Sequence, residues 1–374
     1  MRVPFDPSAQ PVAVSPVASL SPEPEDERLC ADLTADLIAG LTQYRKVRTT
    51  SARPERGYLL TGTLRRAGDR LRLLLQLGDG RGGVLWSERL DGLAGTLRSD
   101  LGATLCARLA AQLATLDRSL AVPPDGPAPD ARGLVRLGQA LGQRYTRLAN
   151  LAARRLFAEA AAADPGYAPA YAGLSRTYHR AWRYGWAEDA ADPLERAVEM
   201  GRAAVDRDPL DARGHAALAS ALLYRSDFEA ALAAFAHATA LNPNDPDILA
   251  EHADAWVHAG EPRRAFGPLE RAMRLNACPP DWYRWYLAGA FFALDQPDEV
   301  VATIARMGDA SEGWRLLAAT FARLGDAEAA RAAAREVLRL YPGFTVAAWA
   351  QRLPDRSATT LERFADGLHR AGLP

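Results

Sequence analysis

The sequence predicts an α+β N-terminal domain followed by an all-α solenoid of helical repeats. Three observations predict this architecture. In the first part, leucines alternate with other residues in short segments such as 71–77, which is the period of a half-buried β-strand. In the second part, prolines and small residues recur at fixed offsets, and Pro209 and Pro243 lie 34 residues apart. Between the two parts, residues 120–131 contain four prolines and one glycine, a composition typical of a linker.

The composition predicts a globular protein that stays in the cytoplasm. Of the 374 residues, 45 are basic and 46 are acidic, and a net charge of −1 gives no general attraction to nucleic acids or membrane surfaces. The three cysteines are scattered along the chain, which indicates a reducing compartment rather than a disulfide framework. No apolar run is long enough for a signal peptide or a membrane-spanning helix. We therefore expect a cytoplasmic location and no membrane partner.

Residues 1–119 are predicted to form the α+β domain. We expect an opening strand at 11–17 and then an amphipathic helix, with Ser21 as its N-cap and Pro22 at its first helical position. The leucines on the core-facing side of this helix recur every four residues, at Leu29, Leu33, Leu37 and Leu41. A second long helix at the end of the domain is expected to carry a leucine stripe from Leu93 to Leu113.

The predicted order β-α-β-β-β-β-α has four strands between these two helices, and three of them are assigned to residues. Residues 58–64 and 71–77 alternate in polarity, and the turn at 67–69 between them predicts a β-hairpin. A second turn at 78–83 leads to a strand at 84–90. This second turn also fits the pattern G-x-G-x-x-G, but a dinucleotide site needs a helix directly after that loop. Because a strand follows it, we interpret the loop as a hairpin turn.

Residues 132–342 are predicted to form about six repeats of the tetratricopeptide type, each built from two helices. Small or apolar residues precede each repeat-ending proline at fixed offsets, and the prolines are Pro165, Pro209, Pro243 and Pro342. Ten additional residues interrupt the second repeat, around residues 183–193. Residues 343–374 are expected to form capping helices that cover the apolar face of the last repeat.

Both parts together resemble one known arrangement. The first part resembles the TolB-like N-terminal domain of bacterial regulators, in the segments VAVSPVASLS (12–21), ADLTADLIAGLTQ (31–43), GYLLTGTLRRAGDRLRLLLQL (57–77) and LWSERL (85–90). The repeats and the ending, 341–374, resemble the tetratricopeptide array of class III adenylate cyclases and CadC-like winged-helix regulators. This resemblance implies the sensory and interaction parts of a regulator without its output domain, so no catalytic residue is carried over.

Ligands of tetratricopeptide arrays usually bind the concave face, which the first helix of each repeat lines. The repeat frame places eight candidate residues of the binding groove on this face: Arg176, His179, Arg180, Tyr224, Asp254, His258, Arg315 and Arg323. Arg176 and Arg180 lie one helical turn apart, so we expect them to grip a carboxylate or phosphate of the partner together. A solvated charged face is the alternative interpretation of the same residues.

Aromatic residues and histidines give two further candidate sites. Trp182, Tyr184 and Trp186 lie in the insertion, outside the repeat frame, and such residues often anchor protein interfaces, although packing is the alternative. His252 is six residues from His258 and therefore points to another side of the helix, whereas zinc needs three or four converging ligands. We expect no metal, no cofactor and no catalytic residue.

A basic stretch at 45–72 is the strongest sign of a nucleic-acid partner. It contains nine arginine or lysine residues and only Glu55 and Asp69 as acids. Clustered positive charge can contact phosphate backbones. If these residues lie on β-strands, part of them point to solvent as ordinary edge charges, which discourage aggregation. We therefore do not expect nucleic acid as the partner.

These features predict a non-enzymatic adaptor that binds a protein or peptide partner in the concave groove. The alternative is a regulatory or sensor component of a signalling or transcription system. An enzyme whose catalytic residues are dispersed along the sequence is a third hypothesis, but no spacing of Ser, Cys, His or Asp residues favours it.

Overall fold

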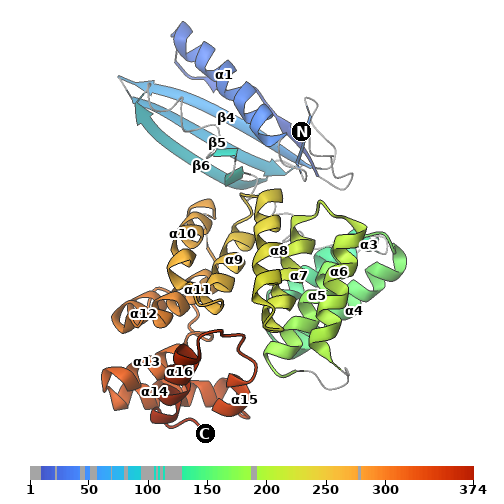
Figure 1. Cartoon of the computed structure of the whole chain (residues 1–374). Coiled ribbons are helices and arrows are strands. Elements are labelled where there is room, and N and C mark those ends of the chain that lie inside the picture. The colour runs from blue at the N-terminus through green and yellow to red at the C-terminus, as the bar shows by residue number, and fades with distance from the viewer. Residues whose placement is uncertain are drawn as a thin grey trace. The chain divides into compact units, whose positions relative to one another are not determined.

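The computed structural model describes residues 10–21, 23–42, 47–50, 57–68, 70–79, 83–93, 105–106, 108–109, 113, 129–186, 192–276 and 279–374. The chain divides into two compact units, Met1–Asp117 and Arg118–Pro374. The first contains a small sheet and the second is built of helices, so an α+β region precedes a helical array (Figure 1). No helix among the described residues has the length and apolar character that crossing a membrane requires.

In the described part of the first unit, six strands form one mixed sheet. The strand order is β3-β1-β4-β5-β6, and β2 also pairs with β4. β1 runs parallel to β3 and β4, whereas β4, β5 and β6 are antiparallel neighbours. The strands are β1 (Gln10–Val14), β2 (Ala18–Ser19), β3 (Val47–Thr50), β4 (Tyr58–Ala67), β5 (Arg70–Asp79) and β6 (Val84–Leu93).

The two expected hairpins are confirmed. Ala67 pairs with Arg70, so a two-residue turn joins β4 to β5, and Gly68 in this turn has a φ of 63°, which glycine adopts without strain. The loop with the G-x-G-x-x-G pattern joins the antiparallel strands β5 and β6 and leads into no helix. Its residues 80–82 lie outside the described residues. The hairpin interpretation of this loop is therefore correct.

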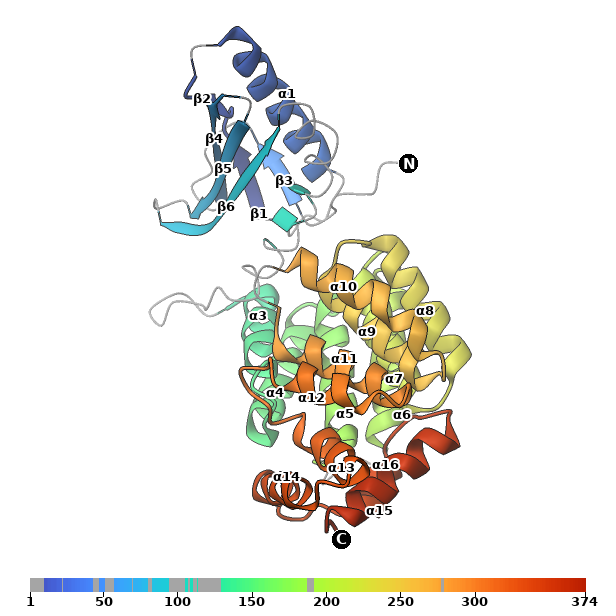
Figure 2. The same ribbon diagram turned by 90° about the vertical axis from the view of Figure 1, so that its left-hand side faces the viewer.

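Helix α1 (Pro24–Leu41) supplies one wall of the first unit's core (Figure 2). Leu33, Leu37 and Leu41 are buried with the leucines of β4 and β5, as the four-residue spacing predicts. The expected start of the helix is wrong by two residues, because Glu23 is the N-cap and Pro24 takes the first helical position. Ser21 instead belongs to the turn before the helix, where its N–H donates to Ser19 Oγ.

The last strand of the sheet is longer than the sequence suggests. Leu93 ends β6 and does not begin a helix, because β6 stays paired with β5 as far as the Arg70–Leu93 pair. Leu105, Leu109 and Leu113 of the expected leucine stripe are buried in the core together with α1. Leu97 and Leu101 lie outside the described residues.

The described residues of the second unit form six helical hairpins. In chain order, the paired helices are α3 (Ala131–Gly142) with α4 (Arg147–Ala163), α5 (Ala168–Arg183) with α6 (Pro193–Arg207), α7 (Ala212–Tyr224) with α8 (Phe228–Leu241), α9 (Pro246–His258) with α10 (Phe266–Leu275), α11 (Asp281–Ala293) with α12 (Pro297–Ile304), and α13 (Trp314–Leu324) with α14 (Ala327–Leu340). A short 3₁₀-helix, η1 (Pro262–Ala265), precedes α10.

The recurring prolines end the hairpins. Pro165, Pro209, Pro243 and Pro342 each lie two residues after the second helix of a hairpin, at α4, α6, α8 and α14. Proline cannot continue a helix, so it suits this position. The insertion in the second repeat lengthens α5, which has 16 residues where α7 and α9 have 13, and it also lengthens the loop that follows.

Small residues allow the helices to cross closely. A Cβ atom added to Gly173 of α5 would lie 2.4 Å from the ring of Phe157 in α4, and one added to Gly138 of α3 would lie 2.7 Å from the same ring. Phe157 is itself 3 % exposed. The ring therefore fills the space between the backbones of α3 and α5. Any side chain larger than that of glycine at residue 138 or 173 would overlap it.

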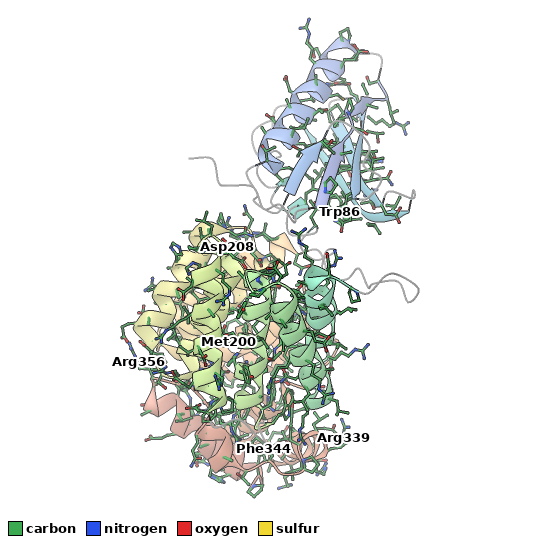
Figure 3. All side chains as sticks on the ribbon, turned by 90° about the vertical axis from the view of Figure 1, so that its right-hand side faces the viewer. Trp86, Met200, Asp208, Arg339, Phe344 and Arg356 are labelled. Carbon is green, nitrogen blue, oxygen red and sulfur yellow. The ribbon has the colours of Figure 1, made fainter. Side chains whose placement is uncertain are left out.

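The C-terminal segment 343–374 reaches further than a cap on the last hairpin. It contains α15 (Val346–Ala350) and α16 (Ala358–Arg370), and α16 packs on α13. Arg363 donates to the carbonyl oxygens of Phe292 and Ala293 at the end of α11, at 2.9 and 3.0 Å. The Arg356 backbone N–H donates to the His258 carbonyl at 2.9 Å, and its guanidinium pairs with Glu229 of α8 (Figure 3). The segment thus returns across three earlier hairpins.

The crossing at Phe157 gives a prediction about stability. Gly173→Ala should lower the free energy of unfolding by roughly 1–3 kcal/mol, because the new methyl group overlaps the Phe157 ring. Gly267→Ala in α10 is the matched control, since a Cβ there meets no atom within 4 Å. Alanine should stabilise that helix by roughly 0.5–1 kcal/mol. Urea denaturation followed by circular dichroism measures both, and equal effects of the two changes would contradict this account.

Candidate functional site

Three adjoining cavities mark the candidate site in the second unit, and all three are lined by Arg183. The first, here the inner cavity, has a volume of about 40 Å³ and lies between Arg176, Tyr224 and Asp254. The second, the apolar cavity, has about 90 Å³ and lies between His258, Trp285 and Phe364. The third, the arginine-lined cavity, has about 410 Å³. Side chains of α5, α7, α9, α11 and α13 line the first two cavities, so the first helices of successive hairpins border a common groove. The C-terminal segment, with Trp349 and Phe364, lines the apolar cavity as well.

Equivalent positions of successive helices form the wall of the groove. Arg180, Tyr224 and His258 occupy corresponding positions in α5, α7 and α9, and Arg176 and Asp254 lie one turn before them. Residues four apart lie on the same side of a helix, so both rows face the groove. Within the row, the ring centroids of Tyr224 and His258 are 6.4 Å apart, and the ring of His179, next to Arg180 in α5, lies 4.4 Å from that of Tyr224.

The structure brings seven of the eight predicted groove residues to these cavities. Five of them line the inner cavity, namely Arg176, His179, Arg180, Tyr224 and Asp254. His258 and Arg315 line the apolar cavity. Arg323 lines none of the three cavities, and its guanidinium pairs with Asp295 in the turn between α11 and α12.

The expected joint grip of Arg176 and Arg180 on an anion is wrong. Arg176 already binds both carboxylate oxygens of Glu251, at 2.5 and 3.0 Å. Arg180 donates to the Gly142 carbonyl at 2.5 Å and lies over the Tyr145 ring at 4.8 Å. Each guanidinium is therefore held by a different part of the chain, and the two do not converge on a third group.

The three aromatic residues assigned to the insertion serve two different purposes. Trp182 lies inside α5 and packs in the core between hairpins, so it is not an exposed interface residue. Tyr184 and Trp186 stack with ring centroids 4.6 Å apart, and both line the arginine-lined cavity. They are partly buried, and the cavity is the surface that they offer to a ligand.

Arg183 is the residue that sequence reasoning missed. It lies in the additional turn of α5, one turn after His179 and Arg180, and it is 9 % exposed. Its guanidinium lies over the rings of Trp285 at 4.4 Å and Tyr224 at 5.5 Å. Within the described part of the chain it makes neither a hydrogen bond nor an ion pair. The stripe of basic residues along α5 was the available signal, but the insertion concealed that the helix continues this far.

Burial suppresses charge on most of the titratable groups in the groove. It raises the pKa of Asp254 to about 7 and lowers the pKa of His258 to about 4, and the charge of Arg183 opposes the first shift and adds to the second. Burial also lowers the pKa of His179 well below its usual value. His258 lies 3.8 Å from Asp254 and 4.0 Å from Asp355. At neutral pH both histidines are uncharged, and the arginines carry the positive charge of the groove.

The groove is suited to binding through hydrogen bonds, aromatic contacts and charge. In the part of the chain that the structure describes, no three histidine, cysteine, aspartate or glutamate residues are placed to hold a metal ion. His252, considered with His258 as a metal ligand, stacks instead between Phe235 and Trp256, at 5.6 Å from each ring.

The basic stretch 45–72 is partly neutralised. Arg66 pairs with the fully buried Asp26 of α1, with 2.9 Å between Nε and Oδ2, and Arg72 pairs with Asp91 of β6 at 2.6 Å. The bond from Arg66 lowers the pKa of Asp26. Residues 45–46, 51–56 and 69 of the stretch lie outside the described residues.

No family model matches the chain. A protein of Rhizobium meliloti (strain 1021) named "Putative adenylate cyclase 3" is 29 % identical over 239 residues, which cover 58 % of this chain and 40 % of that protein. Among solved structures, a thermophilic TPR protein of Thermus thermophilus is 25 % identical with a TM-score of 0.39, over 53 % of this chain and 98 % of that one. A structure of the APC/C hetero-tetramer Cut9-Hcn1 is 15 % identical with a TM-score of 0.47, over 74 % of this chain and 57 % of that one. Tetratricopeptide-repeat proteins are thus among the structural neighbours of the chain.

The raised pKa of Asp254 predicts a pH-dependent stability. Its folded value of about 7 exceeds the value of about 3.9 in an unfolded chain, so the folded protein holds an additional proton between these limits. The resulting stability is present at low pH and is lost as the pH rises through about 7. Asparagine does not titrate, so the Asp254→Asn variant does not lose this stability as the pH rises. The free energy of unfolding of this variant, relative to the unaltered chain, should therefore rise from pH 4 to 8, with a slope approaching about 1.4 kcal/mol per pH unit.

Urea denaturation at a series of pH values tests this. The difference between the two chains cancels the opposite contribution of His258, whose lowered pKa gives stability that is present above about pH 6.5 and lost as the pH falls through about 4. Asp206→Asn on the exposed side of α6 is the control for the substitution itself. The same pH dependence for both variants, or none for Asp254→Asn, would show that the Asp254 carboxyl is not buried in this way.

Proposed function

We propose that the chain is a non-enzymatic adaptor that binds a protein or peptide partner in the groove lined by α5, α7, α9, α11 and α13. One observation carries the proposal: five successive first helices present polar and aromatic side chains to common cavities. Stacked helical repeats create extended inner surfaces of this kind, which suit an extended chain better than a compact substrate. The proposed location is the cytoplasm.

The internal pairing of charges supports a groove that is preformed. Arg176 pairs with Glu251, and Arg315, which is 3 % exposed, pairs with Glu312 at 2.8 Å. The first pair joins two hairpins, and the second is local to the start of α13. Both hold their side chains in place before a partner arrives, which lowers the entropy lost on binding. Tyr286 lines both the inner and the apolar cavity and is only partly buried. Tyrosine in such a position is a good anchor for a partner.

A second candidate function is a regulatory or sensor component of a signalling or transcription system. The similarity to "Putative adenylate cyclase 3" supports it, although the match spans 40 % of that protein. The resemblance of the first unit to TolB-like domains and of the array to those of CadC-like regulators points the same way. In this role the groove would still bind a protein, namely the partner that carries the output.

Selection of random displayed peptides on the full chain tests the adaptor proposal. Enriched peptides should bind the Tyr286→Ala variant at least about tenfold more weakly, because the variant lacks an aromatic anchor. Glu270→Gln on the outer helix α10 is the control and should bind them unchanged, since its side chain is 68 % exposed and remote from the cavities. Peptides that bind both variants equally, or no enrichment at all, would remove the groove as the binding site.

A band-shift measurement separates a regulator that works through a protein from one that binds DNA directly. We expect no shift of a DNA duplex even at low salt, where phosphate attraction is strongest, because carboxylates neutralise Arg66 and Arg72. Asp91→Asn removes the carboxylate that pairs with Arg72. This variant is the control that shows whether an unpaired arginine in this stretch is enough for DNA binding. A shift by the unaltered chain that weakens steeply with salt would show that DNA is a partner after all.

A further inference from the structure

The arginine-lined cavity differs from the rest of the groove in its charge. It lies between the end of α5 and residues 340–352, and the arginines that line it are Arg183, Arg315 and Arg352. None of its described lining residues is acidic. Its volume of about 410 Å³ falls within the range of roughly 300–1,000 Å³ that is usual for small-molecule sites.

Arg183 is a buried cation without a counter-ion in contact. It lacks any hydrogen bond or ion pair within the described part of the chain, and Nε is inaccessible to solvent. Taking a guanidinium out of water is costly unless a partner compensates for the lost hydration. Contacts with the rings of Trp285 and Tyr184 compensate only in part. Asp254 acts on Arg183 only at longer range, and its raised pKa leaves it partly uncharged at neutral pH.

Two further donors in the same wall lack partners. Trp349 Nε1 and Tyr184 Oη are both buried and without a hydrogen bond among the described residues. Burial raises the pKa of Tyr184 well above its usual value, so the hydroxyl keeps its proton and can donate it in a hydrogen bond. Both atoms are shielded from solvent, so each side chain would turn toward the cavity to donate to an acceptor oxygen of a bound anion.

The other two arginines are held in ways that leave donors available. Arg315 pairs with Glu312 and lies over the Trp349 ring at 4.2 Å. Arg352 makes one long bond, to the Ala348 carbonyl at 3.3 Å. Its guanidinium lies against Gly185, where a Cβ atom would be 3.1 Å away. A side chain at residue 185 would push this guanidinium aside by a few tenths of an ångström, and the φ of 64° at Gly185 also favours glycine there.

We propose that this cavity binds a small organic anion, a molecule that carries a phosphate or carboxylate group on a flat aromatic body. Arg183 and Arg352 contact the anionic group, and the stacked pair of Tyr184 and Trp186, with Phe344 and Trp349, contacts the aromatic body. This site goes beyond the proposed peptide groove, because neither Tyr286 nor Asp254 lines it. The bound molecule would join the second hairpin to the C-terminal segment.

Isothermal titration calorimetry on the full chain tests the proposal with three probes. Phenyl phosphate carries both the ring and the charge, inorganic phosphate carries only the charge, and phenol carries only the ring. We expect phenyl phosphate to bind most tightly, phosphate more weakly and phenol not measurably. Binding of phenyl phosphate should also raise the melting temperature, because it joins two distant parts of the unit.

Variants show whether the cavity is responsible. Arg352→Gln removes a partly exposed guanidinium that makes one weak bond, so it should fold normally and weaken binding of phenyl phosphate about tenfold or more. Arg183→Lys keeps the charge but loses the planar donors, and it should weaken binding as well. Arg339→Gln is the matched control, because Arg339 is exposed, pairs with Glu336 and does not line the cavity (Figure 3).

Three results would overturn the proposal. These are no binding of phenyl phosphate, equal binding of phenol, and equal weakening by Arg339→Gln and Arg352→Gln. A tetrapeptide with a C-terminal phenylalanine distinguishes the source of the anion. If its free acid binds tighter than phenyl phosphate and its amide does not bind, the cavity receives a chain terminus and not a small molecule. Failure of the peptide selection at Tyr286 leaves the Arg352→Gln measurement unaffected, because Tyr286 does not line the arginine-lined cavity and Arg352 lines neither of the other two.

Discussion

A helical hairpin of the second unit can bury its apolar face only against neighbouring hairpins, and the groove depends on this stacking. At some crossings the helices approach so closely that only the hydrogen atom of a glycine side chain fits between them. Gly138 and Gly173 admit the Phe157 ring, and a Cβ on Gly201 would lie 2.8 Å from the Leu218 backbone. Because these contacts fix the rotation of each helix, they also fix which side chains face inward. The alignment of Arg180, Tyr224 and His258 is thus a consequence of packing on the opposite side of the same helices.

Burial then decides the electrostatics of that inner face. Arg176 and Arg315 have carboxylate partners within bonding distance, so their charges are compensated inside the chain. Asp254 is too far from Arg183 to form such a bond, and its pKa of about 7 means that its negative charge is incomplete at neutral pH. The charge of Arg183 is therefore least compensated at neutral and lower pH. An anion that binds beside it gains most under these conditions, because partial protonation of Asp254 weakens the competition from that carboxylate.

The sequence is informative wherever a contact follows from the repeat period. The proline spacing places the ends of the hairpins, and equivalent positions in the frame identify Tyr224 and Asp254 as inward-facing residues. Pairings between hairpins do not follow from it, because they depend on how far the array curves. Glu251 lies 75 residues after Arg176 and meets it only because two turns of different hairpins come together. Arg323 has the spacing of an inward-facing residue, but its guanidinium pairs with Asp295 in the neighbouring turn.

The two departures from the repeat pattern meet at one place. The insertion adds a turn to α5 and so carries Arg183 beyond the row that the frame defines, and the C-terminal segment returns along the groove and brings Arg352 to the same point. Neither departure is needed for hairpins to stack, since α7 and α9 stack without a longer helix. The contact between them leaves an open cavity beside a buried cation and unpaired donors, and unpaired buried polar groups lower stability. A ligand that pairs with these groups would supply the stabilisation that the chain itself does not, which is why we place the proposed anion here.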